Sequence, residues 1–183
     1  MNRQQAIKSF GEYLRSHFIR HVVGTDDNSP RFTMVYPYPD SPGGCVEGCI
    51  WFYEDDAEVR CYYSQAGADK CRESANQQDL LELLNFINAR VFLSCGSPEG
   101  LYEPHMLYTP RIYRTADGLF DISATTIINY DFWQLAPVET ADYITIFCPE
   151  LLGKLANPIF DLLAGNKSLD EAISYIKQNI LHE

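Results

Sequence analysis

The sequence lacks any hydrophobic run long enough to cross a membrane. A membrane-spanning helix needs about 20 consecutive, predominantly apolar residues, and no such run occurs among the 183 residues. The first residues, MNRQQAIKSF, also lack the apolar stretch of a secretory signal. We therefore expect a cytoplasmic protein that does not insert into a membrane.

Basic charge is also scarce. Only 14 Lys and Arg side chains stand against 25 Asp and Glu side chains, which gives a formal net charge of −11. Binding to nucleic acid or to anionic lipid depends on a basic surface that displaces counterions. The composition therefore excludes nucleic acid and anionic membrane surfaces from the partners that we expect.

Motifs of catalysis and cofactor binding are missing as well. The sequence contains no GxGxxG, Walker A, GxSxG or protein-kinase signature. It also contains no internal repeat and no linker-like tract, and its length suits one domain with a sizeable core. We predict a single domain over residues 1–183, expect no cofactor, and favour a binding role over an enzymatic one.

An amphipathic helix is predicted over residues 2–22. Ile7, Phe10, Leu14 and Phe18 recur at steps of three and four, as they do along the apolar face of a helix. The following GTDDNSP is rich in turn-forming residues and should end this helix. Next, RFTMVYPYP reads as a strand that Pro37 and Pro39 either confine to an edge or end.

The segment GCIWFYEDDAEVRCYYS predicts a β-hairpin. A turn at Asp55-Asp56 would pair Phe52 with Val59 and Ile50 with Cys61. The strand alternation then separates an apolar face from a second face that carries Cys49, Trp51, Tyr53, Glu58, Arg60 and Tyr62.

The rest of the chain reads as a loop, a helix, a strand pair and terminal helices. The loop is AGADKCRESANQQD, the helix has a stripe from Leu80 to Val91, and the strands flank Ala116-Asp117-Gly118. In the tail we predict a capping box from Ser168 to Glu171 and a helix start or kink at Pro158. The order predicts an α+β fold: an antiparallel sheet, made of a three-strand meander plus a hairpin, with N-terminal, middle and C-terminal helices packed on it.

Two helical segments carry a resemblance to a known family. The segments are LLNFINARV and LANPIFDLLAGNKSLDEAISYIKQN, and the matching features are Asn85, Asn88, Pro158, Gly165, Glu171 and Ala172. Together with the hairpin between them, they resemble the bacterial YbjN-domain proteins, whose fold is like that of type III secretion chaperones. The resemblance implies a non-enzymatic, protein-binding or chaperone-like role, often as a dimer, and supplies no catalytic residue.

Cysteine and histidine leave two alternatives open. The cysteines are Cys45, Cys49, Cys61, Cys71, Cys95 and Cys148. Cys45 and Cys49 enter a strand, where about 3.3 Å per residue would hold their sulfur atoms too far apart to share zinc, so we expect reduced thiols and no metal. His17 and His21, four residues apart, are either a surface pair or a metal pair. His105 could serve as the base for a Cys95 or Cys71 thiolate.

Aromatic side chains are abundant, at 13% of the chain. On the second face of the predicted hairpin, Trp51, Tyr53 and Tyr62 gather with Arg60, and aromatic groups with polar tips are typical of recognition surfaces. We predict that these four residues contact another polypeptide, that a homodimer is possible, and that either the basic N-terminal helix or a partner covers the face. The alternative is a small-ligand or thiol-dependent enzymatic pocket that Trp133 completes.

Overall fold

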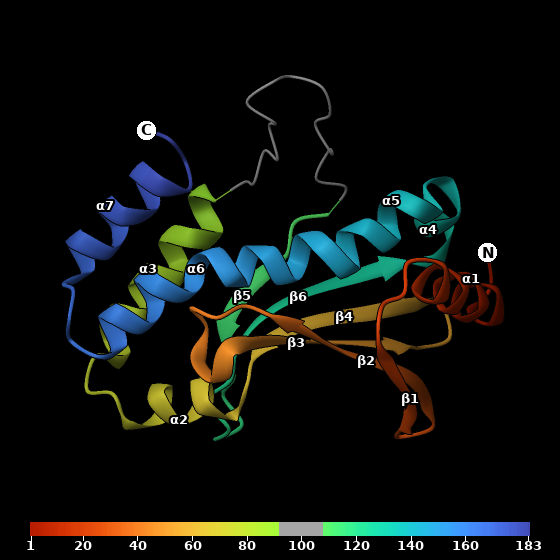
Figure 1. The fold of residues 1–183 in the computed structure, drawn as a ribbon, viewed down its shortest axis with the longest axis horizontal. Coiled ribbons are helices and arrows are strands. Elements are labelled where there is room, and N and C mark those ends of the chain that lie inside the picture. Colours follow the sequence, from red (N-terminus) through yellow and green to blue (C-terminus); the bar gives the residue numbers. More distant parts are fainter. Residues whose placement is uncertain (92–107) are drawn as a thin grey trace.

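A six-stranded antiparallel sheet is the frame of the molecule. The computed structural model describes residues 1–91 and 108–183. The strands lie in the order β1-β2-β3-β4-β6-β5, so β1 and β5 form the two edges (Figure 1). The strands are β1 (His21–Asp26), β2 (Ser29–Pro37), β3 (Cys45–Phe52), β4 (Asp56–Tyr63), β5 (Arg111–Arg114) and β6 (Ile122–Asn129).

Helices precede, interrupt and follow the strands. They are α1 (Arg3–Ser16), α2 (Gln65–Glu73), α3 (Gln77–Arg90), α4 (Tyr130–Leu135), α5 (Pro137–Asp142), α6 (Cys148–Leu163) and α7 (Leu169–Asn179), with a 3₁₀ turn η1 (Pro42–Gly44) and a π-helical segment η2 (Tyr143–Phe147). The predicted α+β class is confirmed. No helix within the described ranges is both long and apolar enough to cross a membrane.

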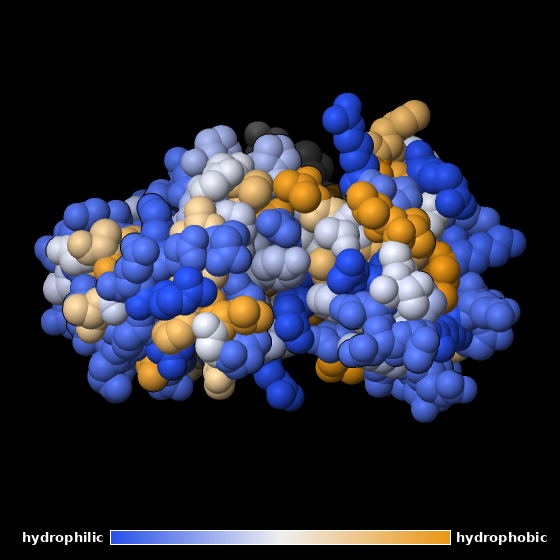
Figure 2. All heavy atoms as spheres, turned by 90° about the horizontal axis from the view of Figure 1, so that it is seen from below, coloured by the Kyte–Doolittle hydropathy of each residue, from blue (hydrophilic) through white to orange (hydrophobic). Residues whose placement is uncertain are grey.

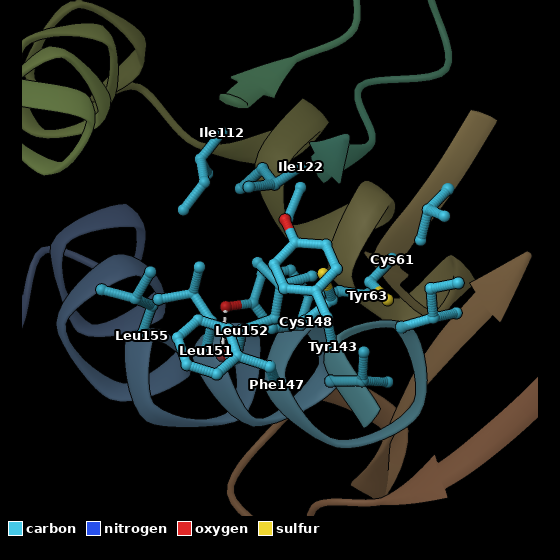
Figure 3. Packing of buried hydrophobic residues seen from close by; sticks show 14 of the residues in the cluster. Cys61, Tyr63, Ile112, Ile122, Tyr143, Phe147, Cys148, Leu151, Leu152 and Leu155 are labelled. Carbon is cyan, nitrogen blue, oxygen red and sulfur yellow. Dashed lines mark hydrogen bonds between the residues drawn. The ribbon is translucent and has the colours of Figure 1, made fainter. Parts of the chain in front are cut away.

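One face of the sheet, which we call the core face, packs against the helices. It carries Phe32, Met34, Ile50, Phe52, Val59, Cys61, Tyr63, Ala124 and Ile128, all of them buried. Figure 3 shows Cys61 and Tyr63 of β4 pointing toward Cys148 and Leu152 of α6. The Tyr63 hydroxyl donates a hydrogen bond of 2.7 Å to the Leu152 carbonyl oxygen, which satisfies the polar tip of a fully buried ring.

The N-terminal helix covers another part of the same face. The ring of Phe10 lies 5.7 Å from that of Phe32, 6.4 Å from that of Phe52 and 5.8 Å from that of Trp133, measured between centroids. A capping box between Asn2 and Gln5 begins the helix. The prediction that this helix could cover the face of Trp51 is therefore wrong, because its apolar stripe is already used on the core face.

The predicted helix over residues 2–22 is too long. Helix α1 ends at Ser16, and His21 begins strand β1, so His17 and His21 do not share a helix. Phe18, which matched the apolar period, has φ of +55° and is 92% exposed. The apolar spacing continues beyond the end of the helix, but residues 21–26 do not form helix, because the β-branched Val22 and Val23 pair with β2.

Strands β1 and β2 form a hairpin where only a turn was expected. Asp27 and Asn28 both have positive φ, at 44° and 65°, as a two-residue type I′ turn requires. Asp and Asn tolerate that conformation because their short polar side chains bond locally. The meander therefore has four strands rather than three.

The β3–β4 hairpin differs from its predicted register by two residues. Ile50 stands opposite Val59, and Phe52 stands opposite Ala57. The Tyr53 N–H donates to the Asp56 carbonyl oxygen at 2.9 Å, so the turn consists of Glu54 and Asp55. A shift of two residues leaves each side chain on its predicted face, because the side-chain period of a strand is two.

Two further predictions about helices need correction, and two are confirmed. Residues 66–73, predicted as loop, belong to α2. Pro158, predicted to start or kink a helix, does not start one, because it lies inside α6. Many buried residues of α6 hold the helix against the core across this proline. The capping box of Ser168 with Glu171 is present, and Gly165 takes φ of +73° after α6.

Candidate functional site

The second face of the sheet, which we call the open face, carries the residues that the sequence singles out. In the described part of the chain α6 packs on the core face, and α2 lies at the end of β4 beside Tyr63 and Phe160 (Figure 1). On the opposite face Val35, Tyr53 and Ile127 are exposed, so no helix covers them. The open face consists of Val22, Asp26, Arg31, Thr33, Val35, Glu47, Cys49, Trp51, Tyr53, Glu58, Arg60, Tyr62, Tyr113, Ser123, Thr125 and Ile127.

Trp51 lies across the strands in the first half of this face. Its indole N–H donates to a carboxylate oxygen of Asp26 at 3.2 Å, and Arg31 holds the same oxygen at 3.3 Å. On the other side the Arg60 guanidinium lies 5.5 Å from the ring centroid, within the range of a cation–π contact. The half-buried ring is thus held between Asp26 of β1 and Arg60 of β4.

Arg60 is fixed in place by Glu58. The guanidinium donates to a Glu58 carboxylate oxygen at 2.6 Å, and the Tyr53 hydroxyl donates to the other oxygen at 3.2 Å. Burial lowers the pKa of Arg60, but the hydrogen bond and charge of Glu58 outweigh it and raise the pKa above its usual value. For Tyr53, burial and the Glu58 charge raise the pKa. Both groups therefore remain donors at neutral pH.

Tyr62 covers a cysteine on the open face. Cys49 Sγ lies 3.5 Å from the Tyr62 hydroxyl and 3.5 Å from Thr33 Oγ1. Burial first, and then the hydrogen bond to Cys49, raise the pKa of Tyr62. Beneath the ring, Ser123 Oγ is buried and has no hydrogen-bond partner among the described residues. The thiol is 3% exposed and is part of the packing, not a free nucleophile.

Aliphatic side chains surround these polar and aromatic groups. Val22 is 70% exposed, Val35 61% and Ile127 56%, and they come from β1, β2 and β6. Figure 2 views the molecule from the side on which β1 and α2 lie lowest in Figure 1, and shows apolar patches interspersed with strongly hydrophilic ones. Exposed apolar and aromatic side chains mixed with oriented polar groups are typical of contact surfaces between proteins.

The structure brings the four predicted contact residues together. Trp51, Tyr53, Arg60 and Tyr62 lie on one face of the β3–β4 hairpin, as their alternation indicates. Trp133 does not join them: it is fully buried beside Phe10, on the helical side of the sheet. A pocket lined by Trp51, Tyr53, Tyr62 and Trp133 together, as the alternative predicted, is therefore not formed.

Sequence reasoning missed the part of the open face that β1 and β6 contribute. Asp26 orients Trp51, and Val22 and Ile127 widen the apolar area. The available signal was the β-branched pair Val22-Val23 followed by two residues suited to a type I′ turn.

The cysteine and histidine side chains of the described residues form no metal-binding cluster. Within residues 1–91 and 108–183, no cluster of three or more His, Cys, Asp or Glu is arranged to hold a metal ion. The described cysteines are free, and Cys71 is fully buried in α2. Cys95 and His105, the components of the alternative thiol site, lie outside the described residues.

Comparison with known proteins identifies no relative of this chain. No protein family, no curated protein and no solved structure matches the chain.

Proposed function

We propose that this protein is a non-enzymatic, cytoplasmic binding domain that holds a segment of another polypeptide on its open face. The observation that supports the proposal is the uncovered set of Trp51, Arg60 and Tyr62, bordered by exposed valine and isoleucine. Exposed apolar and aromatic groups on one face favour a partner there, because burial of apolar surface is worth roughly 25 cal/mol for each Å². The face is also pre-organised, because the Trp51 indole N–H and the Tyr53 hydroxyl already donate hydrogen bonds within the chain.

The partner is a polypeptide with apolar side chains. The net charge of −11 opposes phosphate-rich partners such as nucleic acid and anionic lipid. The charged groups at the centre of the face are mostly paired within the chain, Arg31 with Asp26 and Arg60 with Glu58, so they offer oriented hydrogen-bonding edges more than net charge. Apolar contacts with Trp51, Val35 and Ile127 then supply most of the affinity.

A chaperone-like role follows from the resemblance to YbjN-domain proteins. Chaperone-like binding needs a surface that accepts extended or partly folded segments, and a broad sheet face with aromatic groups suits this use. Self-association, which the same resemblance implies, belongs to this proposal as well.

The test is to capture partners from the native cells, to follow the binding of each purified partner by fluorescence of the unmodified protein, and to compare the affinities of variants by titration calorimetry. Trp51 is half-buried and Trp133 is fully buried, so a partner seated on the open face should change the emission of Trp51 alone. Trp51→Ala should weaken binding by about 2 kcal/mol or more, as expected when a central aromatic anchor is removed.

The matched control is Phe132→Ala, which removes a 64% exposed aromatic ring of α4 outside the open face. This variant should bind as the unmodified protein does. Equal affinity of the Trp51→Ala variant and the unmodified protein, with both folded by circular dichroism, would contradict the proposal.

A further inference from the structure

The two edges of the sheet differ in how their backbone groups are used. At β5, the Asn88 side chain of α3 accepts from the Ile112 N–H at 2.8 Å and donates to the Ile112 carbonyl oxygen at 2.7 Å. These are the groups that would pair with a further strand, so α3 blocks this edge. Such blocking is a common protection of edge strands against association.

The β1 edge carries no protection of that kind in the described part of the chain. Its sequence, HVVGTD, has no proline and no lysine, the residues that usually discourage edge pairing. Val22 is 70% exposed and Val23 is 63% exposed, one on each face of the strand. In Figure 1, β1 lies at the outer margin of the sheet, and apolar side chains gather in the same half of the molecule, on the right of Figure 2.

The hairpin geometry determines which backbone groups of β1 face outward. In a two-residue type I′ hairpin, the pair that flanks the turn is hydrogen-bonded, here Asp26 with Ser29. Because bonded and non-bonded pairs alternate, Thr25 stands in a non-bonded pair, and its partner is Pro30, which has no N–H to offer. The N–H and C=O groups of His21, Val23 and Thr25 therefore point away from the sheet.

We propose that a second copy of this chain pairs antiparallel with β1, so that one sheet runs through a two-fold symmetric dimer. A two-fold axis makes each contact reciprocal. Centred on Val23, the pairing sets Val23 opposite Val23 of the second copy, and His21 opposite Thr25 of the second copy in both directions. In this register the outward N–H and C=O groups of His21, Val23 and Thr25 all pair with the second copy.

The same register brings opposite charges together. Each step of the ladder moves one residue forward in one copy and one residue back in the other, so the exposed Arg20 stands opposite Asp26 of the second copy. This pairing offsets part of the repulsion between two chains that each carry a net charge of −11. The exposed Val22 and Val23 lose water in the same contact.

The dimer has a consequence for the open face. The two-fold axis of such an edge-to-edge pair is perpendicular to the sheet, so both open faces lie on the same side. The inference itself concerns the edge of the sheet and does not rest on the proposed binding at the open face.

The test compares two identical substitutions at valines of similar exposure. Val23→Lys places a charge on the β1 edge, and Val35→Lys places the same charge on β2, within the open face and away from the edge. We expect the unmodified chain to form a dimer whose fraction rises with concentration in sedimentation velocity. Val23→Lys should raise the dissociation constant by at least about tenfold, whereas Val35→Lys should leave it unchanged.

Hydrogen exchange supplies a second readout. In the dimer the amides of His21, Val23 and Thr25 should exchange more slowly than in dilute monomer, while those of Val22 and Gly24, already paired with β2, should change little. A chain that stays monomeric at all concentrations overturns the inference, and so does a dimer that Val23→Lys leaves intact. Loss of partner binding in Val35→Lys with the dimer retained would show that the edge and the open face act separately.

Discussion

The two faces of this sheet are made by the same strands and have opposite characters. On the core face, Phe52 is fully buried and packs against Phe10 and Trp133 through ring contacts alone. On the open face, its neighbour Trp51 is held by a hydrogen bond to Asp26 and by the Arg60 guanidinium. Adjacent residues thus meet two environments because successive side chains of a strand point to opposite sides.

This contrast shows how a sheet with helices on one side can keep aromatic groups on the other. An aromatic ring in the core needs only close packing, whereas an aromatic ring at the surface is oriented by polar partners at its edges. Trp51 stays half-exposed in this arrangement, so part of its ring surface can contact a partner. The predictions below test each side of this difference, from the largest expected effect to the smallest.

The first prediction compares a core residue with an aliphatic residue of the open face. Phe52→Ala should lower the free energy of unfolding by about 3 to 5 kcal/mol, because it leaves a cavity among Phe10, Phe32 and Trp133. Ile127→Ala, at a position that is 56% exposed, should cost less than about 1 kcal/mol. Denaturant unfolding monitored by circular dichroism measures both. Equal losses would mean that the open face is covered within the folded monomer.

The second prediction concerns Asn88, at the border of the sheet, and its helical neighbour Asn85. Asn88→Ala should cost about 1 to 3 kcal/mol, because it leaves the Ile112 N–H and C=O without their partners. Asn85 and Asn88 are both exposed, but the Asn85 side chain makes no hydrogen bond to a described residue, so Asn85→Ala should fall within about 0.5 kcal/mol of the unmodified protein. If the two variants unfold at the same denaturant concentration, α3 does not block the β5 edge.

The third prediction concerns phenol groups on the helical side. Burial, followed by the hydrogen bond to Asp142, raises the pKa of Tyr13 from 10.0 to about 12. Below pH 10 the phenol is neutral in both the folded and unfolded states, so its contribution to stability is fully present. Between about pH 10 and about pH 12 only the unfolded chain loses the proton, so stability should fall over that range.

Tyr13→Phe is the variant that tests this titration. Phenylalanine has no proton to lose, so the decline in stability between about pH 10 and about pH 12 should become shallower. Denaturant unfolding at a series of alkaline pH values measures the slope, and tyrosinate absorbance follows the ionisation. An unchanged slope would show that folding does not raise the pKa of Tyr13.

Much of this fold was predictable because it depends on local periodicity. The alternation in β3 and β4 assigned Trp51 and Arg60 to one face and Ile50 and Phe52 to the other, even though the predicted register was wrong by two residues. The capping box at Ser168 was confirmed because its two hydrogen bonds span only three residues.

The errors fell where a distant partner overrides a local pattern. Residues 18–22 continue an apolar helical period, yet pairing with β2 makes His21–Asp26 a strand. Pro158 is a helix breaker by itself, yet it lies inside α6, which is held by contacts with the sheet and other helices. Local propensity is worth about 1 kcal/mol per residue, which tertiary packing readily exceeds.

The sequence alone determined the α+β class and the gathering of Trp51, Tyr53, Arg60 and Tyr62 on one side of a hairpin, and its net charge of −11 is a property of composition. Each of these depends on composition or on the two-residue period of a strand. Only the tertiary structure decided which side of the sheet α1 covers. Its apolar stripe fits either face by sequence, and the ring contacts of Phe10 with Phe32, Phe52 and Trp133 place it on the core face. The tertiary structure also decided that Asn88 closes the β5 edge while β1 stays unprotected, since an edge strand is defined by its neighbours in space.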